Sequence, residues 1–299
     1  MELKEYLSEK KSLIEEELNK QLPDDNHYPE DLHGSMRYSV FSGGKRLRPI
    51  LAIASAETIG CKEKDIITAG CALELIHAYS LIHDDLPALD NDDFRRGKLT
   101  NHKIYGEAIA ILAGDALLTR AFELLCSIAN KKNQDLNLHR NLIKLIEETA
   151  VAAGSMGMVG GQTVDILSEG KDISEETLRY IHAKKTGALM RVSVRTGAIL
   201  ADAKEKELSN LTTFAENFGL LFQITDDILN VVGDENILGK PIGTDAANKK
   251  ATFPGMYGLE RSKVMAEETA REAQNALADF GATAEPLRML TNFILVRNV

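Results

Sequence analysis

Five aspartates lie close together between positions 84 and 93, and they restrict the folds that this chain can adopt. They are Asp84, Asp85, Asp90, Asp92 and Asp93. Two like charges about 4 Å apart repel by roughly 1 kcal/mol in water and roughly 4 kcal/mol at a protein-like dielectric constant. A fold that gathers these carboxylates therefore needs a cation, and oxygen ligands of this kind favour Mg²⁺ or Ca²⁺. The alternative is a solvated acidic loop that ends in basic residues.

The arginine pair that follows the aspartates suits a ligand of the same site. Arg95 and Arg96 come two residues after the last aspartate, and a guanidinium group binds phosphate oxygens through two parallel hydrogen bonds. Mg²⁺ is typically held by one or two carboxylates together with the phosphates of a substrate. The stretch therefore predicts a site in which magnesium bridges a diphosphate to the protein.

Apolar residues recur at helical spacing along most of the chain. The pattern starts at residues 3–18 and is strong over 63–86, 106–129 and 204–232. Pro87 must end the second of these segments, because proline lacks the backbone donor that a helix requires. Asp172 with Glu175 resembles a capping box that opens a further helix to Leu200. No alternating run is convincing as a strand, so we predict one all-α domain over residues 1–299, a single large helical bundle.

A second acidic pair lies near the end of the helical segment 204–232, in the sequence FQITDDILN. Gln223, Asp226 or Asp227, and Asn230 share one helix face, because they are spaced at i, i+3 or i+4, and i+7. Metal sites in helical bundles are commonly built from side chains on facing helices. The two acidic pairs are therefore candidates to clamp one diphosphate through several metal ions, although the second pair alone also fits a solvated helix end.

Basic residues form local clusters next to glycines or in loops, where the backbone can approach a phosphate closely. The clusters are Lys45, Arg46 and Arg48; Arg95 and Arg96; Lys184 and Lys185; and Lys240 with Lys249 and Lys250. His77 precedes Asp84 on the same helical segment and is a further ligand candidate. A solvated charged surface is the plain alternative for each cluster.

Composition excludes several classes of protein. The net charge of −10 disfavours nucleic acid as a partner. Charges interrupt every apolar run before about 18 residues, which predicts no membrane span. The N-terminal residues lack the apolar core of a signal peptide, and Cys61, Cys71 and Cys126 lack metal-ligand spacing. We expect the cysteines to be reduced and buried and the chain to be cytoplasmic.

Seven segments, in order, resemble the motifs of the short-chain trans-polyprenyl diphosphate synthases, most closely the bacterial farnesyl diphosphate synthases. They are GGKRLRP, ELIHAYSLIHDDLPALDNDDFRRGK, GMVGGQ, KTGAL, FQITDD, LGKPIGTD and KKATFP. The resemblance covers nearly the whole chain. It implies a helical bundle of the isoprenoid synthase type, a homodimer, and condensation of isopentenyl diphosphate with an allylic diphosphate by ionisation, carbon–carbon bond formation and proton loss.

The resemblance also implies a role for each matching residue. Mg²⁺ ions that bridge the allylic diphosphate would be bound by Asp84, Asp85 and Asp90 of the first motif and by Asp226 and Asp227 of the second. The allylic diphosphate itself would be contacted by Arg95, Lys185, Lys240 and Lys250. Isopentenyl diphosphate would be held by Lys45, Arg48, His77 and Arg96. The developing allylic cation would be stabilised by the side-chain oxygens of Thr186 and Gln223.

Two positions depart from the family pattern. The second motif usually reads DDxxD, but its last position here is Asn230, whose amide can bind magnesium without supplying charge. Phe253 stands where tyrosine is more usual, and we expect little effect. Asp234 is a candidate to compensate for Asn230.

The residues just before the first motif imply the length of the product. Tyr79 and Ser80 are the fifth and fourth residues before Asp84, and in the family such residues line the floor of the chain-growth pocket. A bulky Tyr79, with the insertion that contains Pro87, resembles enzymes with a fifteen-carbon product. The alternative is a core aromatic residue far from substrate.

Rival functions stay open at this point. A geranyl or geranylgeranyl diphosphate synthase would share the mechanism, and a non-catalytic regulatory subunit finds support only in Asn230. A terpene cyclase would not need the second basic site, and no phosphate-binding loop of the strand–glycine–helix type appears.

Overall fold

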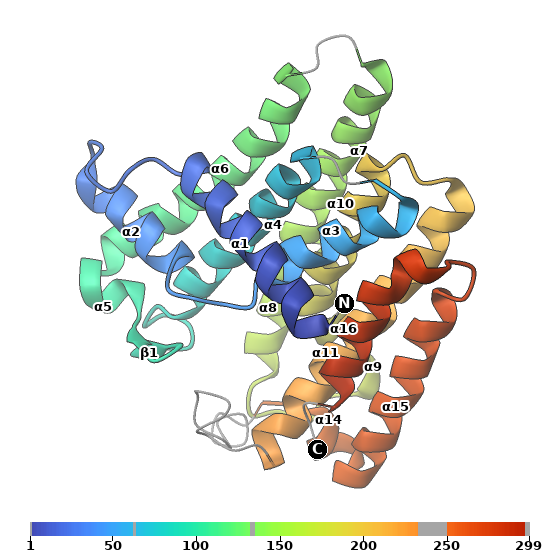
Figure 1. Ribbon diagram of the computed structural model, residues 1–299. Helices are drawn as coiled ribbons and strands as arrows, with labels where there is room; N and C mark the ends of the chain where they lie inside the picture. Colours follow the sequence, from blue (N-terminus) through green and yellow to red (C-terminus); the bar gives the residue numbers. More distant parts are fainter. Residues whose placement is uncertain (1, 62–63, 132–134, 233–249, 297–299) are drawn as a thin grey trace. The chain divides into compact units, whose positions relative to one another are not determined.

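The computed structural model describes residues 2–61, 64–131, 135–232 and 250–296, and these are almost entirely helical. The helices in chain order are α1 (Leu3–Gln21), α2 (Glu30–Val40), α3 (Leu47–Ile59), α4 (Lys64–Asp84), α5 (Asn101–Tyr105), α6 (Glu107–Lys131), α7 (Leu136–Ala153), α8 (Met158–Ser168), α9 (Glu175–Ile181), the π-helix η1 (His182–Gly187), α10 (Ala188–Leu200), α11 (Glu205–Val232), α14 (Phe253–Tyr257), α15 (Leu259–Ala276), the 3₁₀-helix η2 (Ala282–Ala284) and α16 (Glu285–Val296). Figure 1 shows this helical architecture. The all-α prediction is confirmed.

Contacts divide the chain into two compact units, and each unit combines segments that are distant in sequence. The first consists of Met1–Leu3, Leu51–Lys62 and Glu147–Val299, and the second of Lys4–Ile50 and Glu63–Ile146. The single domain over residues 1–299 stays a prediction.

The second unit is built around α4, which packs along α6 (Figure 1). Its side chains Leu73, Leu75 and Ile76 are completely buried. The stretch Asp65–Asp84 is long and apolar enough to cross a membrane by length and composition, but 72% of its most apolar part is buried inside the protein. The burial pattern is that of a core helix.

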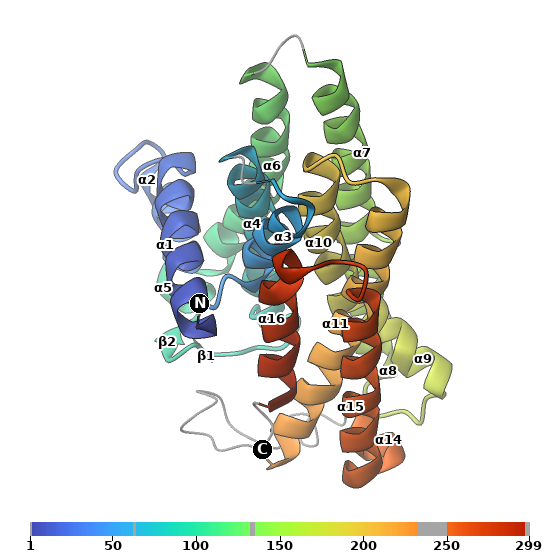
Figure 2. The ribbon, with the colours of Figure 1, turned by 45° about the vertical axis from the view of Figure 1, so that its right-hand side comes forward.

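The first unit is built around α11, which lies between α10 and α15 in sequence order and packs against both (Figure 2). Phe214 and Phe218 on α11 are fully buried and contact each other at 5.6 Å between ring centroids. This apolar face explains why the helix continues for 28 residues. Its last turns carry the second acidic pair.

Three local expectations were wrong. The cap of α9 is Ser174, whose side chain accepts a hydrogen bond from the Thr177 N–H, not Asp172. Cys71 is buried as expected, but Cys61 is half-buried and Cys126 is exposed. A short antiparallel hairpin, β1 (Phe94–Arg95) with β2 (Lys98–Leu99), follows the first acidic cluster.

Candidate active site

The first acidic motif lies where α4 ends. The helix closes at Asp84, and Pro87 follows in an exposed turn. The chain then folds back, because the Asp90 N–H donates to the Asp84 carbonyl at 2.8 Å and the Asn91 N–H donates to the Leu86 carbonyl at 3.1 Å. Asp90 is therefore held beside the end of the helix that carries Asp84.

Asp85 is the buried member of this motif, and Arg95 is its partner. The Arg95 Nε lies 2.7 and 2.9 Å from the two carboxylate oxygens, and a terminal nitrogen of Arg95 lies 2.5 Å from Oδ1. Burial raises the pKa of Asp85, while Arg95 opposes that shift. Arg95 also lies 3.5 Å from Asp92. The guanidinium therefore already neutralises part of the acidic cluster.

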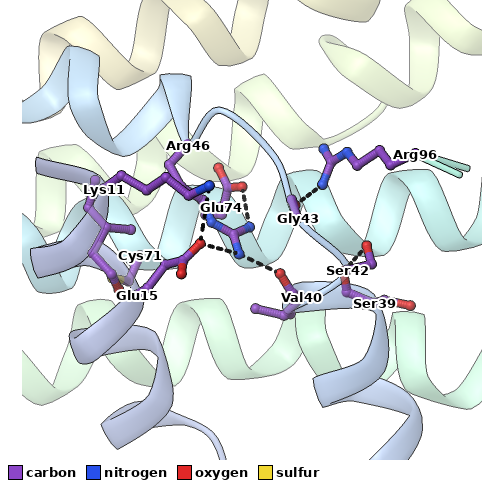
Figure 3. Close-up of polar contacts among 11 residues, drawn as sticks. Lys11, Glu15, Ser39, Val40, Ser42, Gly43, Arg46, Cys71, Glu74 and Arg96 are labelled. Carbon is purple, nitrogen blue, oxygen red and sulfur yellow. Dashed lines mark hydrogen bonds and ion pairs between the residues drawn. The ribbon is translucent and has the colours of Figure 1, made fainter. Parts of the chain in front are cut away.

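The hairpin of β1 and β2 sets the positions of Arg95 and Arg96. Arg96 and Gly97 form its turn, and both have positive φ, 54° and 76°. This two-residue turn matches the right-handed twist of the flanking strands. It directs Arg96 to the Gly43 carbonyl, to which its guanidinium donates (Figure 3). Gly44 has a φ of 130°, a backbone conformation that L side chains rarely adopt, so glycine is favoured there.

A concentration of positive charge surrounds His77 in the same unit. Burial lowers the pKa of His77 well below its ordinary value, and Arg48, Arg96, Arg95 and Arg46 lower it further. Burial also lowers the pKa of Arg48 to about 10, and its buried Nε makes no hydrogen bond. Buried polar groups normally have partners. The positive charge of the cluster therefore favours the binding of an anion.

Arg46 has a different role from the other basic residues. Its side chain is buried, donates to Glu74 at 2.9 Å and to the Val40 carbonyl at 2.7 Å, and lies 3.3 Å from Glu15 (Figure 3). Arg46 has a φ of 51°. These contacts fix the loop between α2 and α3, and Arg48 follows this loop close enough to His77 for its charge to lower the His77 pKa. Lys45 in the same loop is exposed.

The donor set of the first motif fits magnesium. Among the residues that the structure describes, no three acidic, histidine or cysteine side chains converge into a closed ligand set. Mg²⁺ does not need one, since it takes one or two carboxylates and completes its shell with water and substrate phosphates. Asp84 and Asp90, joined through the backbone, are the carboxylates best placed for this purpose.

The second acidic motif is buried at the end of α11. Asp227 is 5% and Asn230 3% exposed, whereas Gln223 and Asp226 are half-buried. The Asp227 Oδ2 accepts the Phe253 N–H at 2.9 Å. The start of α14 is thus anchored to the acidic motif. Because this contact uses the backbone, it does not depend on whether position 253 is phenylalanine or tyrosine.

Sequence reasoning missed His182, which is central to this region. It lies in η1, and its ring stacks on Phe253 with centroids 5.1 Å apart and planes 17° apart. Burial lowers its pKa to about 4. The signal in the sequence was weak, because a single histidine among lysines does not reveal a π-helix. Such turns are rare and occur frequently at functional sites.

The π-helix also carries two predicted site residues. The Lys185 Nζ lies 2.6 Å from the Asp165 carboxylate on α8, and Thr186 is half-buried. The helices approach closely here, because a Cβ on Gly161 would lie 2.2 Å from the Lys185 backbone nitrogen. Lys250 is half-buried. Lys240, Lys249 and Asp234 lie outside the described residues.

The two predicted chain-length residues lie one turn before the first motif. Tyr79 is 6% exposed, and its ring contacts His83 edge-on at 5.7 Å. Burial, followed by the charge of Asp84, raises the pKa of Tyr79 to about 12. The Ser80 hydroxyl donates to the His77 carbonyl at 3.0 Å.

Comparison with known proteins gives a consistent result. The polyprenyl synthetase family model matches residues 29–285. A geranylgeranyl diphosphate synthase of Cyanophora paradoxa is 47% identical over 98% of this chain and 96% of its own, and a farnesyl diphosphate synthase of Bacillus subtilis is 42% identical over 99% and 98%.

Solved structures agree with the sequence relatives. An FPP/GFPP synthase from Zymomonas mobilis has a TM-score of 0.86 at 35% identity and covers 98% of both chains. A putative farnesyl-diphosphate synthase from Marinomonas sp. MED121 has a TM-score of 0.83 at 41% identity and covers 99% of both. This chain therefore belongs to the polyprenyl synthetase family and is a prenyltransferase.

Proposed function

We propose that this prenyltransferase condenses isopentenyl diphosphate with dimethylallyl and geranyl diphosphate to give farnesyl diphosphate. The observation that carries the proposal is the cluster around His77, where arginine charge gathers beside paired carboxylates on one helix end. Cations and carboxylates together suit two diphosphates, one bound directly and one bound through metal. Tyr79, buried one turn before Asp84, supports the fifteen-carbon product.

The first step is loss of diphosphate from the allylic substrate. Negative charge grows on the leaving group, and cationic groups positioned in advance stabilise that charge. Arg95, Lys185, Lys240 and Lys250 are proposed to contact it. Mg²⁺ held by Asp84, Asp85 and Asp90, and by Asp226 and Asp227, would supply Lewis-acid stabilisation of the leaving diphosphate.

The second substrate needs a separate anion site. Lys45, Arg48, His77 and Arg96 are proposed to hold the diphosphate of isopentenyl diphosphate. The buried Nε of Arg48 has no protein partner, and His77 in its neutral form can donate a hydrogen bond without adding charge. These residues orient the substrate so that its double bond meets the allylic carbon.

The cation formed between these steps requires stabilisation and exclusion of water. The side-chain oxygens of Thr186 and Gln223 are proposed to lie against it. The product then forms by loss of a proton. We further propose that the enzyme is a cytoplasmic homodimer.

A product assay tests the proposal. Purified protein is incubated with labelled isopentenyl diphosphate and with dimethylallyl or geranyl diphosphate, first with Mg²⁺ and then with EDTA. Farnesyl diphosphate formed only with metal is the expected result. Absence of product with every allylic primer would overturn the proposal and favour a non-catalytic subunit with Asn230 as its distinguishing change.

A geranylgeranyl product is the second candidate. Relatives named geranylgeranyl diphosphate synthase reach 47% identity, slightly above the 42% of those named farnesyl diphosphate synthase. The same assay separates the two, because a twenty-carbon product would keep the mechanism and overturn the role given to Tyr79. A ten-carbon product would indicate a geranyl diphosphate synthase.

A further inference from the structure

The ring of His182 connects two residues to which the proposed reaction gives roles. Its Nδ1 lies 3.2 Å from the Gln223 side-chain nitrogen, and its Nε2 lies 3.6 Å from the Asp227 Oδ2. The same Asp227 oxygen accepts the Phe253 N–H, and Phe253 stacks on the His182 ring. The imidazole is 7% exposed. The ring therefore has one face against Phe253, its Nδ1 in hydrogen-bond contact with Gln223, and its Nε2 turned toward the Asp227 carboxylate at 3.6 Å.

With the Gln223 amide nitrogen toward Nδ1, one tautomer of the ring fits these contacts. An amide nitrogen only donates hydrogen bonds, so the His182 Nδ1 must accept, and the ring proton must be on Nε2. That proton then faces the Asp227 carboxylate. Nε2 is buried and makes no hydrogen bond, and the Asp227 carboxylate 3.6 Å away faces it.

The opposite orientation of the Gln223 amide is disfavoured. If its oxygen faced Nδ1, Nδ1 would carry the proton, and Nε2 would turn a lone pair toward the carboxylate of Asp227. Two acceptors at this distance repel in a buried setting, where electrostatic effects are strong. The ring therefore directs the Gln223 oxygen away from itself.

We propose that His182 is a positioning residue, which fixes the Gln223 side chain with its oxygen available to the substrate and links the π-helix η1 to the second acidic motif. This inference rests on the proposed function for the role of Gln223. His182 itself does not contact the reacting atoms. It acts through Gln223 and Asp227, which face its two ring nitrogens.

A first experiment is independent of activity. Nitrogen-15 NMR of the full-length protein separates protonated from unprotonated ring nitrogens, and the His182 signals are assigned by their loss in His182→Asn. The proposal requires an unprotonated Nδ1 and a protonated Nε2 at neutral pH. A protonated Nδ1 would overturn it, whatever the enzyme makes.

A second experiment separates the two contacts. The amide of His182→Asn reaches the Nδ1 position and can still accept from Gln223, whereas the amide of His182→Gln reaches the Nε2 position and can only replace the contact to Asp227. Loss of one oriented hydrogen bond costs about 1.4 kcal/mol, or about tenfold in rate. We expect His182→Gln to lower kcat about tenfold or more and His182→Asn to lower it less, with KM for isopentenyl diphosphate nearly unchanged.

The control is His139→Asn on α7, because the His139 ring is also hydrogen-bonded, in its case to the Ala129 carbonyl, and lies outside the candidate site. Thermal unfolding of every variant separates activity from folding. Wild-type kcat in His182→Gln, or losses that match the unfolded fraction, would overturn the positioning role. Absence of product from the wild type would instead overturn the proposed function and leave the NMR result standing.

Discussion

His77 makes the free energy of unfolding depend on pH. In the unfolded chain a histidine takes up a proton below about pH 6.5, but burial and the nearby arginines keep the pKa of folded His77 well below that value. Below about pH 6.5 the unfolded state therefore binds more protons, and the free energy of unfolding falls as pH falls. The raised pKa of Asp85 acts in the opposite direction, nearer pH 4.

Replacement of His77 removes its contribution to the fall in the free energy of unfolding at low pH. We expect His77→Asn to lose less stability than the wild type between about pH 7 and about pH 5.5, as measured by urea unfolding at both values. His182, whose pKa is also lowered, leaves part of the slope in place. His27→Asn, at an exposed position, is the control. Equal slopes in wild type and His77→Asn would contradict the prediction.

A substitution of Tyr79 tests whether this residue limits the length of the product. Tyr79→Ala removes a buried ring next to His83, which opens space one turn before Asp84. We expect prenyl products longer than fifteen carbons, detected by chromatography of the labelled products. Tyr28→Ala is the matched control, because Tyr28 is 87% exposed. Farnesyl diphosphate as the longest product of Tyr79→Ala would refute the assignment.

At the scale of elements, the π-helix depends on a close approach that only glycine permits. Gly161→Ala would place a Cβ 2.2 Å from the Lys185 backbone nitrogen, so α8 and η1 must separate. Overpacking of this kind typically costs about 1–3 kcal/mol. We expect a lower midpoint of thermal unfolding and a reduced kcat, since Lys185 and Thr186 lie in η1. Thr163→Ala, at an exposed site on α8, should change neither, and a wild-type kcat in Gly161→Ala would contradict the expectation.

The helices were predictable because burial imposes a regular spacing on apolar residues. The segment 204–232 became α11 with nearly the same ends, and Pro87 follows the end of α4 as expected. The π-helix was not predictable, since its wider turn depends on the packing of η1 against α8 and against α11 rather than on local composition. The hairpin was missed because its strands have only two residues each, although the Arg96–Gly97 pair is a turn signal.

At the scale of the whole molecule, residues of one predicted function come from distant segments. The basic loop, the end of α4 and the hairpin belong to one unit, and they contribute Arg46, Asp85, Arg95 and Arg96 to the lining of one pocket. Spacing along the chain reveals which residues are charged but not which ones are already paired. Arg46 illustrates this limit, because its terminal nitrogens are already bound to Glu74 and to the Val40 carbonyl, which the sequence GGKRLRP does not reveal.

Binding of ligand to the folded chain alone should stabilise the whole molecule. A ligand at one hundred times its Kd adds about 2.7 kcal/mol, and each kcal/mol raises the unfolding midpoint by about 2–4 °C in a large domain. We expect inorganic diphosphate with Mg²⁺ to raise the midpoint by several degrees, EDTA to remove most of the shift, and Asp84→Asn to reduce it. Asp115→Asn, at an exposed position on α6, is the control. A full shift in EDTA and in Asp84→Asn would mean that the arginine cluster alone binds the diphosphate, so the aspartates would need a role other than magnesium binding.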